Sequence, residues 1–134
     1  MIVVLDTNVL VSGILRPYGH AGTILRWAAA GMLRLAYDQR ILAEYRDVLH
    51  RPVFGFSPDH VDALLEQFEQ EGFSVVAGSL PFTLPDPSDA PFLEVALAGR
   101  VDALVTGNKK HFIPGEPLVS VLSPAEFIRS FKLD

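Results

Sequence analysis

Ile2-Val3-Val4-Leu5-Asp6 is the stretch of sequence that decides the fold. Its first four residues are apolar, three of them are β-branched, and no polar position alternates with them. This pattern is typical of a strand that is covered on both faces, as the strands of a parallel sheet are. The strand expected at residues 2–5 therefore ends in an acidic side chain. Functional groups of open α/β sheets gather beyond the carboxyl ends of the strands, which makes Asp6 the first candidate functional residue.

The rest of the chain alternates between strand and helix patterns. We expect further strands at residues 33–37, 73–77, 101–106 and 119–122, helices at 8–15, 20–30, 39–50, 58–71 and 91–99, and a last helix that begins at the capping box Ser123-Pro124-Ala125-Glu126. Strands that alternate with helices predict a three-layer α/β/α fold, in which helices cover both faces of a mainly parallel central sheet. The length suits a single domain over residues 1–134.

Composition narrows the class of protein. Apolar residues make up 49% of the chain and charged residues 20%, a balance that is typical of globular proteins. The absence of cysteine excludes disulfides, thiolate zinc sites and a cysteine nucleophile, and it suits a reducing cytoplasm. The apolar start carries Asp6 and Asn8 and no basic leader, so we expect a buried strand and not a signal peptide. No apolar run approaches the roughly 20 residues that span a bilayer, so we expect a cytoplasmic protein with no membrane partner.

Polar side chains are expected to meet at the carboxyl edge of the sheet. Asp6 follows the first strand, Asp89 stands just before the helix at 91–99, and Asn108 follows the fourth strand. Glu44, one turn into the helix at 39–50, can join them. Hard divalent cations such as Mg²⁺ prefer carboxylate and other oxygen ligands, so this edge is a candidate metal site.

Each of these residues also has a purely structural interpretation. Asp6 could cap the helix that follows it, and Glu44 could be a solvated residue of an amphipathic helix. Turn and cap chemistry favours aspartate at both Asp86 and Asp89, so one of the two is expected to be structural. Asp89 is the better ligand candidate because it is nearer the helix start. Asn108 could be a turn residue.

The net charge of −5 argues against a broad phosphate-binding surface, although metal ions on carboxylates can reverse the local sign of the field. The chain has no glycine-rich phosphate loop of the Walker or dinucleotide type. Its four histidines lack zinc-site spacing, and most are expected at the surface. His111 is the exception, because it directly follows Lys109 and Lys110 beside the expected site.

Four segments, taken together in their order and spacing, resemble the PIN-domain family. They are Leu5 to Ser12, Ile41 to Tyr45 with Val48-Leu49, Asp86 to Asp89 through Phe92-Leu93-Glu94, and Asp102 to Asn108 with His111-Phe112. The likeness runs from residue 1 to about 125. It is greatest to the branch of toxin components of toxin-antitoxin systems, the VapC-like ribonucleases.

The resemblance implies a Mg²⁺- or Mn²⁺-dependent endoribonuclease that cleaves single-stranded RNA. Asp6, Glu44 and Asp89 match the first three acidic positions of the family and would hold the metal. Asn108 falls on the fourth catalytic position, where many PIN domains carry aspartate, so that the site would have one negative charge fewer.

The resemblance also assigns supporting roles. Asn8 and Thr106 match polar positions that orient the acidic groups by hydrogen bonds. Arg16, Lys109 and Lys110 are candidates for contact with the RNA backbone, with plain surface charge as the alternative.

The implied partners are single-stranded RNA, an antitoxin protein and a second copy of the chain in a homodimer. Exposed apolar residues of the helices at 20–30 and 58–71 could serve such association. The alternative hypothesis keeps the fold without the chemistry, as a PIN-like module that binds RNA or a protein and does not cut. Asn108 and the acidic composition favour that alternative.

Overall fold

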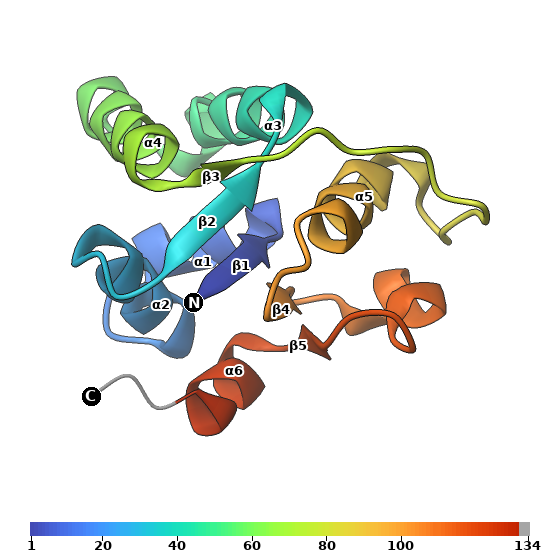
Figure 1. Cartoon of the computed structure of the whole chain (residues 1–134). Helices are drawn as coiled ribbons and strands as arrows, with labels where there is room; N and C mark the ends of the chain where they lie inside the picture. The colour runs from blue at the N-terminus through green and yellow to red at the C-terminus, as the bar shows by residue number, and fades with distance from the viewer. Residues whose placement is uncertain (132–134) are drawn as a thin grey trace.

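A five-stranded sheet forms the centre of the protein, in a computed structural model that describes residues 1–131 (Figure 1). The strands are β1 (Ile2–Leu5), β2 (Arg34–Tyr37), β3 (Phe73–Ser74), β4 (Ala103–Val105) and β5 (Val121–Leu122). Their order is β3-β2-β1-β4-β5, and every neighbouring pair is parallel. The chain therefore runs outward from β1 to one edge and then crosses back to fill the other, so that strand order reverses at β1.

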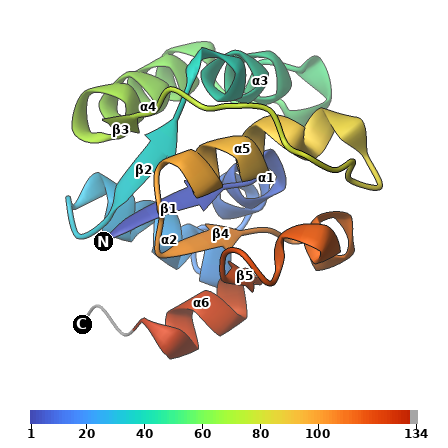
Figure 2. The same ribbon diagram turned by 45° about the vertical axis from the view of Figure 1, so that its right-hand side comes forward.

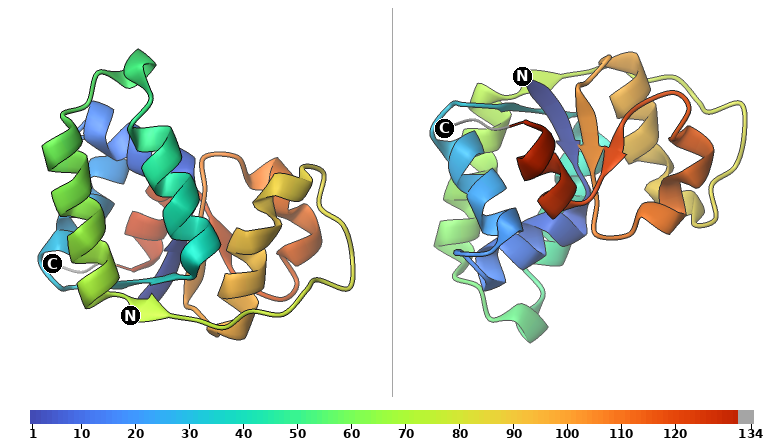
Figure 3. Two further views of the ribbon diagram at one scale, coloured as in Figure 1. Left: turned by 90° about the horizontal axis from the view of Figure 1, so that it is seen from above. Right: turned by 90° about the horizontal axis from the view of Figure 1, so that it is seen from below.

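Helices cover both faces of the sheet. They are α1 (Thr7–Leu15), α2 (His20–Ala29), α3 (Gln39–Leu49), α4 (Pro58–Glu71), α5 (Ala90–Ala98) and α6 (Pro124–Ser130). Figure 3 shows α3, α4 and α5 over one face and α1, α2 and α6 over the other. Figure 2 shows α5 lying over β1 and β4. These layers confirm the predicted three-layer α/β/α fold.

The burial of β1 explains why its sequence lacks polar alternation. Val3, Val4 and Leu5 are fully buried, because β1 is the middle strand and carries helices on both faces.

The start of α3 is set by a capping residue. Asp38 caps α3 by accepting a hydrogen bond from the backbone N–H of Ile41 at 3.1 Å, which fixes the point at which the chain leaves β2 for α3.

Four strands are shorter than the sequence predicts, β2 by one residue and β3, β4 and β5 by two or three. The strand expected at 73–77 pairs with β2 only at Phe73 and Ser74, since β2 ends at Tyr37 and offers no partner beyond the bond from Val75 N–H to the Tyr37 carbonyl. The strands expected at 101–106 and 119–122 are likewise limited by short partners. The segment between β4 and β5 contains the 3₁₀ helix η3 (Lys109–Gly115), and two further 3₁₀ helices are η1 (Pro52–Phe54) and η2 (Pro87–Asp89).

None of the helices within residues 1–131 combines the length and the apolar character that crossing a membrane requires.

The helical hairpin of α1 and α2 depends on a close approach at Gly22. A Cβ atom built on Gly22 would lie well inside van der Waals contact with the carbonyl group of Pro17. We expect Gly22→Ala to lower the free energy of unfolding by about 2 kcal/mol, because the backbone must shift to make room. Urea denaturation would measure the change. Gly78→Ala is the matched control, since no atom lies within 4 Å of its added Cβ. Equal stability of the two variants would contradict the expected steric conflict.

Candidate functional site

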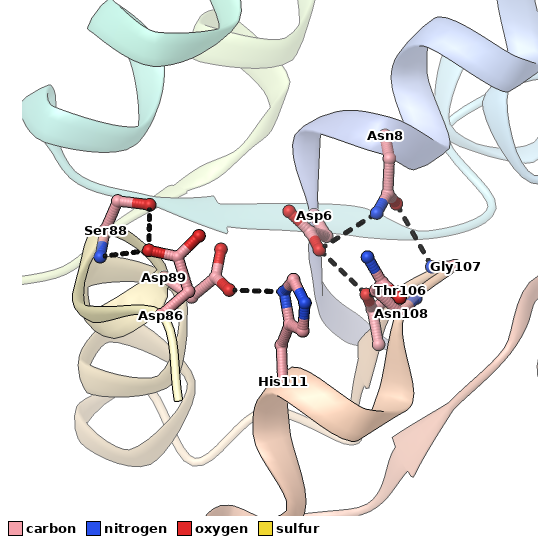
Figure 4. Close-up of polar contacts among 9 residues, drawn as sticks. All are labelled: Asp6, Asn8, Asp86, Ser88, Asp89, Thr106, Gly107, Asn108 and His111. Atoms are coloured by element: carbon pink, nitrogen blue, oxygen red, sulfur yellow. Dashed lines mark hydrogen bonds and ion pairs between the residues drawn. The ribbon is translucent and has the colours of Figure 1, made fainter. Parts of the chain in front are cut away.

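The carboxylate of Asp6 lies at the carboxyl end of β1, where the strand order reverses (Figure 4). Asp6 is only 6% exposed to solvent. The Oδ2 atom accepts a hydrogen bond from Oγ1 of Thr106 at 2.7 Å and from Nδ2 of Asn8 at 3.3 Å. Asp6 occupies the N-cap position of α1, yet its side chain makes no capping hydrogen bond. The carboxylate is therefore held by two side-chain donors.

The loop after β4 is hydrogen-bonded to the two side chains that orient this carboxylate. The backbone N–H of Asn108 donates to Oγ1 of Thr106 at 2.9 Å, and that of Gly107 donates to Oδ1 of Asn8 at 3.1 Å. Thr106 is fully buried, whereas Asn108 is exposed. The backbone at Asn108 is thus fixed close to Asp6, while its side chain stays accessible.

Glu44 reaches the same edge from α3. Oγ1 of Thr7 donates a hydrogen bond to its Oε2 atom. The next residue, Tyr45, is buried, and its hydroxyl donates to the carbonyl of Leu5. The adjacent pairs Leu5-Asp6 and Glu44-Tyr45 are therefore held together, which places the Glu44 side chain beside the end of β1.

Asp89 reaches the site from the junction of η2 and α5. Its Oδ2 atom lies 3.0 Å from Nδ1 of His111, which belongs to η3. Asp86 instead accepts hydrogen bonds from the backbone N–H and the hydroxyl of Ser88, at 3.0 and 2.7 Å. Potential ligand atoms of Asp86, Asp89 and His111 all lie within 4.8 Å of one another, and in the described part of the chain no other such trio is found. In the view of Figure 4, His111 lies between the two aspartates and Asp6.

The acidic groups at this edge raise one another's pKa. Burial raises the pKa of the Asp6 carboxyl to about 6; the hydrogen bond from Thr106 offsets part of this shift, and the negative charges of Asp89 and Glu44 add to it. Burial also raises the pKa of Asp89, against the lowering effect of the hydrogen bond to His111. Asp6 after β1, Glu44 of α3 and Asp89 before α5 thus repel one another, although their oxygen atoms do not all lie within 4.8 Å of one another. Their oxygen atoms are the donor set that a hard divalent cation requires.

The basic residues expected near the site differ in their surroundings. Nζ of Lys109 forms an ion pair with Glu126 at 3.0 Å. Arg16 and Lys110 are exposed, and neither forms an ion pair within residues 1–131. Among the three, only Arg16 and Lys110 therefore lack an acidic partner within the described residues.

Two residues that support the site were not singled out from the sequence. Thr7 holds Glu44, and Tyr45 holds α3 against β1. The position of Thr7 directly after Asp6 was the only available signal. A tyrosine on the apolar face of a helix gives no indication that its hydroxyl has a backbone partner.

Comparisons with known proteins show the family and the fold of the chain. The family model described as "PIN domain" matches residues 2–110, so the chain belongs to the PIN-domain family. The predicted resemblance to that family is confirmed. No curated protein matches the chain. Among solved structures, a chain in the crystal structure of VapBC2 from Rickettsia felis bound to a DNA fragment from their promoter has a similar fold, with a TM-score of 0.57 and 17% sequence identity. The likeness covers 92% of this chain and 98% of that chain.

The raised pKa of Asp6 predicts a dependence of stability on pH. The folded state binds the Asp6 proton more tightly than the unfolded state, whose pKa is about 4. Protonation of Asp6 therefore favours the folded state at low pH, and this contribution is lost as the pH rises from about 4 to about 6. Above that range the ionised carboxylate lowers the free energy of unfolding by about 3 kcal/mol. We expect Asp6→Asn to raise the free energy of unfolding in chelator at pH 8, and to raise it less at pH 4.5.

Urea denaturation at the two pH values would measure both effects. Asp59→Asn is the matched control, because Asp59 is exposed on α4 and should change stability little at either pH. A destabilised Asp6→Asn protein at pH 8 would contradict the burial cost assigned to Asp6.

Proposed function

We propose that this chain is a divalent-metal-dependent endoribonuclease that cleaves single-stranded RNA. The observation that carries the proposal is the buried Asp6 carboxylate, fixed by two side-chain donors and facing the charges of Glu44 and Asp89. Such a cluster is unfavourable in a partly buried place unless a cation neutralises it. Membership of the PIN-domain family supports the nuclease assignment.

The donor set suits Mg²⁺ or Mn²⁺. Asp6 and Asp89 would be direct or water-mediated ligands, and Glu44 would be a ligand or would orient the attacking water. Asn108 would contribute a neutral oxygen. Because Thr106, Asn8 and Thr7 already hold the acidic groups in place, the cation would meet ligands that need little rearrangement.

The reaction proposed is hydrolysis of a phosphodiester. When bound, the cation lowers the pKa of a water molecule, polarises the scissile phosphate and neutralises charge on the leaving oxygen. Water adds to phosphorus, and the bond from phosphorus to O3′ breaks, which leaves a 5′-phosphate and a 3′-hydroxyl. Arg16 and Lys110, the two without an acidic partner in the described residues, are the candidates for contact with the flanking phosphates, and Lys109 would have to leave Glu126 to join them.

We further propose that the chain is the toxin component of a toxin-antitoxin pair. The fold shared with a chain of the VapBC2 structure supports this role. An antitoxin protein as partner, a homodimer, a cytoplasmic location and a single domain over residues 1–134 complete the proposal.

The alternative function is an RNA- or protein-binding module that does not cut. Asn108 favours it, because a neutral ligand in place of an acidic one weakens metal binding. A fluorogenic RNA assay with Mn²⁺, repeated with chelator, separates the two functions: cleavage that chelator abolishes supports the nuclease.

Asp6→Asn should abolish this cleavage, because the central ligand loses its charge while its shape and fold are kept. Pure variant protein would be compared with wild type by gel analysis of a labelled single-stranded RNA. Asp59→Asn, remote from the site on α4, should cleave at the wild-type rate. Undiminished cleavage by Asp6→Asn would end the assignment of Asp6.

Asn108→Asp should tighten the binding of Mn²⁺ by about ten-fold, since an anionic ligand replaces a neutral one in a partly screened place. Isothermal titration calorimetry of the metal-free protein would measure the affinity. Gln70→Glu adds the same charge at an exposed position of α4 and should leave the affinity unchanged. Equal or weaker binding by Asn108→Asp would show that residue 108 does not contact the ion.

A further inference from the structure

A cavity of about 470 Å³ lies beside the acidic cluster, between α1, α3 and η1. Its walls are mainly apolar and include Val11 and Leu15 of α1, Val48 of α3 and Phe54 of η1. Leu15 is 53% exposed and the other three are half-buried, so this apolar surface opens to solvent. The volume falls within the range of pockets that hold small organic ligands. The proposed reaction alone gives these apolar residues no role.

The cavity is continuous with the proposed nuclease site. Thr7 and Asn8 line it, and the same two side chains hold the acidic groups: Thr7 donates to Glu44, and Asn8 donates to Asp6. A strand of nucleic acid whose phosphate lies at Asp6 therefore has the cavity beside it for a neighbouring nucleotide.

The charge at the cavity fits a polyanion. Arg16 lines it, is exposed, and forms no ion pair in the part of the chain that the structure describes. Its guanidinium is free to contact a phosphate next to a base that occupies the cavity. An apolar protein segment would need neither this cation nor the continuity with the acidic cluster.

The aromatic wall is held by its own packing. The ring of Phe54 stacks on that of Phe56, with centroids 5.4 Å apart and an angle of 11° between the planes. Gly55 between them adopts a left-handed conformation, with a φ of 65° that makes the turn possible. Single-stranded RNA is recognised largely by stacking of unpaired bases on aromatic side chains, and such stacking tolerates any base.

We infer that this cavity is a nucleobase subsite, which takes one unpaired base of the RNA next to the scissile phosphate. The inference rests on the proposed function, because it names how the same site holds its single-stranded substrate. Val11, Val48 and Phe54 enclose the base, and Arg16 contacts the adjoining phosphate.

Fluorescence anisotropy tests the subsite without cleavage. Two labelled ten-nucleotide probes are titrated in chelator: a single-stranded RNA, and a phosphoribose chain of the same length that lacks every base. Wild-type protein should bind the RNA about ten-fold more tightly than the baseless chain, the effect of one stacked base. Val48→Trp fills the cavity and should remove this preference while leaving the affinity for the baseless chain unchanged. Arg16→Gln should weaken the binding of both probes by the same factor.

Matched variants keep the test decisive. Val76→Trp makes the same replacement at a position that is 97% exposed and outside the cavity, and it should retain the preference. Phe54→Leu keeps an apolar wall without the aromatic face and should reduce the preference; thermal denaturation checks that both cavity variants fold. Equal wild-type binding of the two probes, or a Val48→Trp protein that keeps the preference, would overturn the subsite and favour a protein segment as occupant.

The Mn²⁺ cleavage assay on wild-type protein separates this outcome from failure of the proposed function. Base-dependent binding without metal-dependent cleavage would refute the nuclease and support the subsite. Cleavage without base-dependent binding would support the nuclease and refute the subsite.

Discussion

The hydrogen bond from Thr106 to the buried carboxylate of Asp6 joins the two central strands at the edge where the acidic groups gather. A carboxylate removed from water is costly unless fixed donors replace its hydration. Thr106 and Asn8 supply those donors, and each also accepts a backbone N–H of the loop after β4. This network can form because β1 lies between β2 and β4, so that the ends of β1 and β4 are adjacent. The position of Asn108 is a consequence of this network.

A second connection explains how an acidic residue on a helix reaches a strand end. The Tyr45 hydroxyl has no access to water and donates to the Leu5 carbonyl, the last acceptor of β1 before Asp6. An unpaired hydroxyl in the core would cost folding free energy, so Tyr45 fixes the depth of α3 against the sheet. Glu44, one residue earlier, is thereby directed to the edge, where Thr7 holds it.

The sequence predicted the layers of the fold for physical reasons, and it placed acidic groups at one edge of the sheet. Unbroken burial of β1 leaves an apolar run, and parallel strands end at one edge, so Asp6 and Asn108 could be placed together from the sequence alone. Position favoured Asp89 over Asp86 as a ligand; in the structure Asp86 is bonded to Ser88 and Asp89 to His111, and potential ligand atoms of both aspartates lie within 4.8 Å of His111. Strand lengths could not be predicted, because they depend on how far each partner extends. Nor could the contacts of Thr7 and Tyr45 be predicted, because they join segments that are distant in the sequence.

The acidic side chains of this chain differ in whether they have a basic partner. Glu94 is neutralised by Arg40 at 2.7 Å, Asp47 by Arg51 and Glu126 by Lys109. Within residues 1–131, Asp6 and Glu44 have no lysine or arginine partner, and Asp89 has only a histidine. The site acids therefore keep their negative charge without a competing basic side chain, as do other acids such as Glu66 and Glu69 of α4, and such charge attracts counterions from solution. Added monovalent salt would weaken that long-range attraction and leave the short-range coordination intact.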